Sequence, residues 1–187
     1  MKLGVLLFPV PGGSSQLAQM IEGMGFDSLV FADTQNITPE VWGQLMLAAR
    51  DTERIELGTG VTNPGTRDAA VTASAALSLQ VESNGRAVCG IGRGDSSLGK
   101  IGRGPVPVDE FERYVERLQG YIRGDEVDRD GTPSFIAGAY SVPCPHRASR
   151  VARRRRSRRG RSGCVARNRA CGKIVCNECA SAEQVRA

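Results

Sequence analysis

The sequence predicts an α/β fold built around a parallel β-sheet. Between Lys2 and Gly124, a short apolar run followed by a helical pattern occurs four times, and the runs begin 25 to 32 residues apart, the length of one βα unit. The runs lack polar alternation, which is typical of parallel strands covered on both faces. The predicted strands are Lys2–Phe8, Asp27–Ala32, Arg54–Gly60 and Arg86–Ile91. Strict alternation of strand and helix leaves two architectures, an open doubly wound sheet or a (β/α)8 barrel.

The first two predicted helices have recognisable starts. Ser14 or Ser15 is the expected N-cap of the first helix, and Gly25 is expected to end it. Thr38 is the expected N-cap of the second helix, with Pro39 at its first helical position. Apolar residues recur at helical spacing in both segments, so each helix should bury one face.

The third helix is predicted in the alanine-rich stretch from Ala69 to Leu79, whose small side chains would let a helix lie close to a sheet. The fourth should carry an Asp109–Arg113 pair at i,i+4 and end at Gly124. Its apolar face is formed by Phe111, Val115, Leu118 and Ile122.

The charge of the chain divides near residue 146. Of the 25 basic and 20 acidic side chains, residues 1–146 hold 12 and 18, a net of −6, whereas residues 147–187 hold 13 and 2, a net of +11. The latter segment contains no Leu, Met, Phe, Tyr or Trp, so it cannot bury enough apolar surface to offset its ordering entropy. We therefore expect a folded domain over 1–143 and a largely disordered, Arg- and Cys-rich tail over 144–187.

Three interpretations of this tail remain open. The run Arg153–Arg156 could bind nucleic acid non-specifically by counterion release, which gives an alternative function as a non-catalytic, basic nucleic-acid-binding protein. Cys176 and Cys179 form one CxxC pair that Cys164 and Cys171 could complete, but a zinc ribbon pairs two such knuckles, so no metal site is predicted. The composition also suits an out-of-frame translation of GC-rich DNA.

No membrane span or secretion signal is expected. The chain lacks an apolar run of about 18 residues, and Pro9 and Pro11 interrupt the short apolar run at its start. A cytoplasmic protein with reduced thiols is the expectation.

Polar and glycine-rich loops follow the second, third and fourth predicted strands. They are Ala32–Gln35, Gly58–Pro64 and Gly90–Ile101, and the carboxyl ends of parallel strands are where α/β folds bind ligands. The last loop is similar to a P-loop, but Ile101 lacks the hydroxyl that such a loop needs for Mg²⁺. Its glycines favour a rim where the backbone approaches a ligand closely.

These motifs resemble the luciferase-like monooxygenase superfamily, and most of all its branch that uses coenzyme F420 or FMN. The resemblance rests on three segments taken in order, VFADTQ from Val30, LGTGVTNP from Leu57 and GIGRGDSS from Gly90, and it is supported by VDEFERYVE from Val108. It extends from residue 1 to roughly 135–143. It implies the N-terminal half of a (β/α)8, TIM-type barrel with the coenzyme ring at the C-terminal mouth.

The resemblance also implies roles for particular residues. Asp33, Thr34 and Asp95 would be catalytic, with Asp33 and Thr34 lining the reacting face. Gly60 and Val61 would form a bulge behind the ring, often with a cis peptide bond that is not at proline. The further cofactor-binding residues would be Thr62, Asn63, Gly92 and Gly94. The coenzyme supplies the hydride chemistry in such enzymes, and the protein supplies a slot and hydrogen bonds.

The implied function is a flavin- or deazaflavin-dependent oxidoreductase that acts on a small organic substrate by hydride transfer or monooxygenation. A (β/α)8 barrel needs about 250 residues, and the resemblance covers four of its eight strands. We therefore expect a truncated chain with open sheet edges, weak stability or a homodimer across an edge, and little or no activity.

Overall fold

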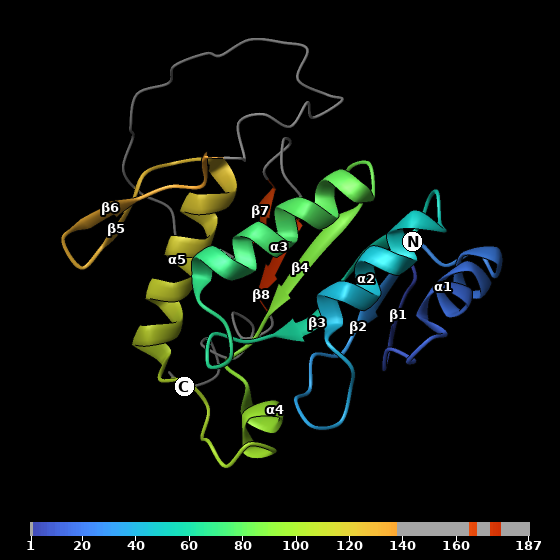
Figure 1. Cartoon of the computed structure of the whole chain (residues 1–187), viewed down its shortest axis with the longest axis horizontal. Coiled ribbons are helices and arrows are strands. Elements are labelled where there is room, and N and C mark those ends of the chain that lie inside the picture. Colours follow the sequence, from blue (N-terminus) through green and yellow to red (C-terminus); the bar gives the residue numbers. More distant parts are fainter. Residues whose placement is uncertain (1, 138–164, 168–172, 177–187) are drawn as a thin grey trace, which may run out of the picture.

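Four parallel strands lie side by side in chain order, as the sequence predicts. In this computed structural model, which describes residues 2–137, 165–167 and 173–176, they are β1 (Gly4–Leu7), β2 (Ser28–Phe31), β3 (Glu56–Thr62) and β4 (Ala87–Ile91). The register sets Leu6 beside Val30, Val30 beside Gly58 and Gly58 beside Val88. All four strands therefore end along one edge of the sheet, where their following loops meet (Figure 1).

Helices separate the strands and cover one face of the sheet. They are α1 (Ser14–Gly23), α2 (Val41–Arg50), α3 (Ala69–Glu82) and α5 (Val108–Arg123), and α2 and α3 lie across the strands in Figure 1. The buried core between these layers includes Leu29, Phe31 and Leu57.

The other face of the sheet is more open, which corrects the expectation that both faces are covered. Leu6, which points to that face, is 56% exposed; its neighbour Val30, and Val88 on β4, are half-buried. Polar alternation is absent from the sequence because glycines such as Gly58 and Gly60, rather than polar residues, occupy this face of β3.

Two of the predicted helix starts are wrong: α1 begins earlier than expected and α2 begins later. Gly13 is the N-cap of α1, and Ser14 instead lies in the first turn, where its hydroxyl donates to the Val10 carbonyl (3.0 Å). Glu40, not Thr38, is the N-cap of α2, because its longer carboxylate reaches the Gly43 N–H (2.6 Å).

The predicted helix ends are confirmed. Gly25, with φ +86°, follows α1, and its N–H donates to the Glu22 carbonyl while that of Phe26 reaches back to Ile21. These two hydrogen bonds form a Schellman motif, which requires the left-handed backbone conformation that glycine adopts readily. Gly124 ends α5 in the same way, with φ +78°.

Three short elements were not predicted. Helix α4 (Asp95–Gly99) lies within the glycine-rich loop after β4, and strands β5 (Val127–Arg129) and β6 (Thr132–Ser134) form a hairpin after α5. The hairpin turn places Asp130 and Gly131 at φ 55° and 90°. An Asp-Gly pair is the usual sequence for this type I′ turn, so the signal was present in the sequence.

Part of the basic tail departs from the predicted disorder. Strand β8 (Lys173–Cys176) pairs in parallel with β4, and β7 (Val165–Arg167) pairs antiparallel with β8. Backbone pairing needs no apolar core, and an edge strand offers unpaired N–H and C=O groups. The β4 edge is therefore paired rather than open, whereas β1 has no second neighbour within the described residues.

The remaining predictions for the tail are untested. The arginine run and three of the cysteines proposed as zinc ligands lie outside the described residues, so the nucleic-acid and zinc interpretations stay hypotheses. In the part of the chain that the structure describes, no helix is long and apolar enough to span a membrane.

Arg86 fastens the end of the sheet opposite to the predicted site. Its guanidinium donates to the carbonyls of Ile55 (2.8 Å), Thr52 (2.8 Å) and Ala49 (3.0 Å), to the Thr52 hydroxyl (3.0 Å) and to the Ser83 carbonyl (2.7 Å). Ala49 lies in the last turn of α2 and Ser83 is the C-cap of α3, and a helix dipole favours a cation at this end.

Arg86→Ala should lower the free energy of unfolding by about 2–4 kcal/mol, because several part-buried carbonyls lose a charged donor. Urea denaturation measures this change. Arg50→Ala is the matched control, since the Arg50 side chain is 73% exposed and pairs with its sequence neighbour Asp51; it should leave the urea midpoint unchanged. Equal midpoints for the two variants would contradict the role given to Arg86.

Glu22 makes stability depend on acid pH. Burial opposes ionisation of this carboxylate, but the backbone N–H groups of Glu53, Arg54 and Ile55 all donate to it and hold the pKa of Glu22 below its ordinary value. A carboxyl with a lowered folded-state pKa adds stability above its unfolded pKa, about 4.3. That stability is lost as the pH falls through the folded pKa.

Glu22→Gln should therefore flatten the dependence of the urea midpoint on pH below about 5. Glu82→Gln, at an exposed carboxylate at the end of α3, serves as the control and should keep the wild-type slope. If Glu22→Gln also keeps that slope, the hydrogen bonds from the three backbone N–H groups do not stabilise the ionised carboxylate of Glu22.

Candidate functional site

The carboxyl ends of β2, β3 and β4 bring the predicted site residues together from three loops. Asp33 follows β2, Thr62 ends β3, and Gly92 follows β4 with its N–H donating to the Thr62 carbonyl (2.9 Å). Neighbouring strands in parallel register place these positions side by side, which is why residues far apart in the sequence meet.

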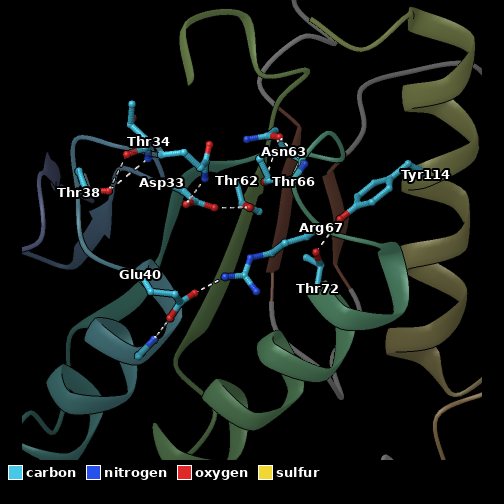
Figure 2. Close-up of polar contacts among 12 residues, drawn as sticks. Asp33, Thr34, Thr38, Glu40, Thr62, Asn63, Thr66, Arg67, Thr72 and Tyr114 are labelled. Atoms are coloured by element: carbon cyan, nitrogen blue, oxygen red, sulfur yellow. Dashed lines mark hydrogen bonds and ion pairs between the residues drawn. The ribbon is translucent and has the colours of Figure 1, made fainter. Parts of the chain in front are cut away.

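Asp33 is the buried carboxyl of this group. It is 6% exposed, and its Oδ2 accepts a hydrogen bond from the Thr62 hydroxyl (2.6 Å) while its Oδ1 accepts one from the Gln35 amide (2.8 Å) (Figure 2). Burial raises the pKa of Asp33; the Thr62 hydrogen bond and the positive charge of Arg67 offset this only in part. Asp33 thus holds its proton more readily than an ordinary aspartate.

Thr34 shapes the loop that carries Asp33. Its carbonyl accepts hydrogen bonds from the N–H (3.0 Å) and the hydroxyl (3.1 Å) of Thr38, which closes a turn ahead of α2. The Thr34 side chain is half-buried, next to Asp33 at the edge of the cavity described below.

The bulge expected after the third strand is present. The register between β3 and β4 shifts between Thr59 and Thr62, and the peptide bond between Gly60 and Val61 is cis. The bulge is packed tightly, because a Cβ at Gly60 would lie 2.6 Å from Val30 and one at Gly92 would lie 2.8 Å from Val61. At both positions a valine side chain occupies the space that a Cβ would need, which favours glycine there.

Thr62 and Asn63 have no exposed surface. While Thr62 binds Asp33, the Asn63 amide donates to the Ser97 hydroxyl (3.1 Å), and its carbonyl oxygen accepts from the Thr66 N–H (3.1 Å) and hydroxyl (3.2 Å). These two adjacent residues therefore link the loops after β2, β3 and β4.

Asp95 stands apart from this buried cluster. Its carboxylate is 61% exposed and pairs with Arg93 at 3.4 Å, and it makes no hydrogen bond to the Asp33 group. Gly94, with φ +89°, precedes it as the N-cap of α4. The structure thus brings Gly94 to the site rim but does not bring the two predicted catalytic carboxylates into contact.

A cavity of about 500 Å³ adjoins Asp33, between the loop after β2 and the start of α3. Arg67 and Glu40 form an ion pair in its wall (Figure 2), and Gln35 contributes a buried side-chain oxygen that has no hydrogen-bond partner among the described residues. The complete lining is Asp33, Thr34, Gln35, Asn36, Thr38, Pro39, Glu40, Thr66, Arg67, Asp68 and Val71.

Sequence reasoning missed Arg67, Glu40 and Gln35 as parts of the site. Each lies in a loop that follows a predicted strand, so its position was a signal. Only the fold shows that Arg67, 27 residues after Glu40, reaches back to it.

The fold is that of an α/β protein of the TIM-barrel class, a class whose members bind ligands at the carboxyl ends of their strands. A family model described as luciferase-like monooxygenase matches residues 9–152. The chain belongs to this family, so the resemblance seen in its motifs is confirmed.

Relatives of known activity are similar to part of this chain. The 5,10-methylenetetrahydromethanopterin reductase of Methanolobus tindarius is 36% identical over 124 residues, which are 65% of this chain and 38% of that protein. The reductase of the same name from Methanopyrus kandleri is 37% identical over 146 residues, covering 68% of this chain and 42% of the relative. The chain thus spans less than half the length of these relatives.

Solved structures share the fold. A coenzyme F420-dependent tetrahydromethanopterin reductase from Methanopyrus kandleri superimposes with a TM-score of 0.62 at 29% identity, covering 71% of this chain and 44% of that one. A type II Baeyer-Villiger monooxygenase from Pseudomonas putida, solved with FMN, gives a TM-score of 0.61 at 14% identity, covering 75% and 45%. The predicted half of a (β/α)8 barrel is thereby confirmed for the N-terminal part of the chain.

Thr62→Val should raise the pKa of Asp33 further, because it removes a hydrogen bond to the ionised carboxylate. Carboxyl ¹³C NMR titration of the labelled protein measures the change. The control is Thr59→Val, since the Thr59 hydroxyl is also buried but bonds to Gly90 and not to Asp33. An Asp33 titration that shifts equally in both variants would rule out a specific Thr62 effect.

Proposed function

We propose that this chain forms the N-terminal half of the mouth of a flavin- or deazaflavin-dependent oxidoreductase that acts on a small organic substrate. The observation that carries the proposal is the buried Asp33 carboxyl beside a polar cavity, at the carboxyl ends of the strands in a fold of this family. Coenzyme F420 is favoured over FMN, because the F420-dependent reductase is the more similar in sequence of the two structures compared above.

The residues present fit such a group. A volume of about 500 Å³ lies within the range of small-molecule sites, and the Gln35 oxygen, which has no partner among the described residues, can accept a hydrogen bond from a ring N–H. The Gly60–Val61 bulge does not line this cavity; the resemblance implies that it would back the ring, and Gly60 presents no bulky side chain there. When bound, the coenzyme would supply the hydride chemistry.

The chain's own residues would orient the substrate and manage a proton. Asp33 would hold or release a proton at its carboxyl oxygens, and Thr62 and Gln35 would keep it in one orientation. Thr62 and Asn63 would act as buried supports of the loops instead of contacting the ligand, because neither has exposed surface. Asp95 would contribute its exposed carboxylate at the rim of the site.

Titration of the full chain with F420, and separately with FMN, followed by coenzyme fluorescence tests the proposal. We expect saturable but weak binding, because four strands provide only part of the surroundings of the ring. Asp33→Asn should weaken binding roughly tenfold, as expected for a lost charge-assisted hydrogen bond. Asp51→Asn, at a carboxylate held by Arg50 and Ser15 away from the cavity, should bind as the wild type does.

Two outcomes would count against the proposal. Fluorescence that does not saturate with either coenzyme would show that the chain has no such binding site. Equal weakening of binding by Asp33→Asn and Asp51→Asn would contradict the role of Asp33. Absence of turnover with a bound coenzyme agrees with the expectation of little activity.

A further inference from the structure

The residues from 93 to 106 form a closed loop between β4 and α5. The Val106 N–H donates to the Arg93 carbonyl (3.0 Å), so the two ends of the loop meet, and α4 lies inside it. The segment from Gly99 to Pro105 is exposed throughout, whereas Ser97 and Leu98 are buried. This is the arrangement of an Ω-loop that packs through a few of its own side chains.

Leu98 is the side chain through which the loop packs. It is 1% exposed, and its methyl groups fill the space that two glycines leave. A Cβ at Gly65, in the loop after β3, would lie 2.6 Å from Leu98 Cδ1, and a Cβ at Gly94 would lie 2.7 Å from the same atom. Since real Cβ atoms do not approach so closely, both glycines are needed for Leu98 to occupy this notch.

Three hydrogen bonds join the same loops around Leu98. The Asn63 amide donates to the Ser97 hydroxyl (3.1 Å), and the Arg103 guanidinium donates to the Gly65 carbonyl (2.6 Å). On the other side, the Asn36 amide donates to the Lys100 carbonyl (3.3 Å), which connects the loop to the one after β2. The 93–106 loop is thus fastened across the mouth to both neighbouring loops.

We propose that Leu98 is a positioning residue of the candidate site, which holds the 93–106 loop against the loop after β3 and so fixes Asp95 at the rim. The reason is geometric: Asp95 lies three residues before Leu98 in α4, and among the described residues its exposed carboxylate pairs with Arg93. The part of the inference that concerns ligand binding rests on the proposed function.

Amide hydrogen exchange of the full chain, resolved by peptide, tests without any ligand whether Leu98 holds the 93–106 loop in place. Leu98→Ala should speed exchange of the peptides from the 93–106 loop about tenfold or more and leave β1, β2 and β3 unchanged, because the loop opens without the rest of the domain. The matched control is Ile101→Ala in the same loop: its side chain is 36% exposed and lies outside the glycine notch, so wild-type exchange is expected.

A complementary pair of substitutions tests the notch itself. Gly65→Ala places a methyl group where Leu98 lies and should also release the loop. In the double variant Gly65→Ala, Leu98→Ala, the added methyl occupies the vacated space, so the loop should exchange more slowly than in either single variant. Additive effects of the two substitutions on loop exchange would contradict the proposed packing of Leu98 against Gly65.

The remaining outcomes separate the role of Leu98 in the loop from the proposed function. Faster exchange in all strands of Leu98→Ala would show that Leu98 is an ordinary core residue. Unchanged exchange of the 93–106 loop would show that Leu98 does not hold that loop in place. With the coenzyme that the wild type binds, Leu98→Ala should dissociate several-fold faster; equal dissociation from a loosened loop would overturn the positioning role. If the wild type binds neither coenzyme, the proposed function fails, whereas the exchange data still decide whether Leu98 holds the loop.

Discussion

The hydrogen bonds of Thr62 and Asn63, two adjacent residues at the end of β3, hold the mouth of the sheet together. Thr62 fixes Asp33 after β2, and Asn63 joins Thr66 after β3 to Ser97 after β4. Both side chains are fully buried, and a buried polar group left without its partner costs about 1–3 kcal/mol. Three loops with no sequence relation to one another are therefore held in one arrangement, and the cavity beside Asp33 depends on it.

The two ends of the sheet use polar groups differently. At the amino-terminal end, Arg86 and Glu22 bind backbone groups that would otherwise be unpaired, so the network serves stability. At the carboxyl end, the buried Asp33 has a raised pKa, and the neighbouring Gln35 oxygen has no partner in the part of the chain that the structure describes. Such unfavourable features persist at sites that bind ligands, which agrees with the usual division of a TIM-type barrel into a stabilising and a functional end.

The sheet itself is only partly enclosed in the described residues. Helices cover one face, Leu6 remains exposed on the other, and β1 keeps one edge without a neighbouring strand. In a complete barrel this inner face would surround other side chains. The chain matches less than half of the length of its relatives, and its described residues form four βα units with an open inner face.

Local patterns in the sequence were sufficient for the four main strands and the four main helices, because strand and helix periodicity, and the glycines at positions 25 and 124, act over a few neighbouring residues. The same patterns, ordered as in a known family, predicted the Gly60–Val61 bulge, which the structure contains, and proposed Asp33 and the rim glycines as site residues. They did not identify Glu40 as a helix cap, the Arg67–Glu40 ion pair or the packing of Leu98 against Gly65 and Gly94. Those contacts join residues from different loops, and their distances are decided only when the parallel register brings the strand ends together.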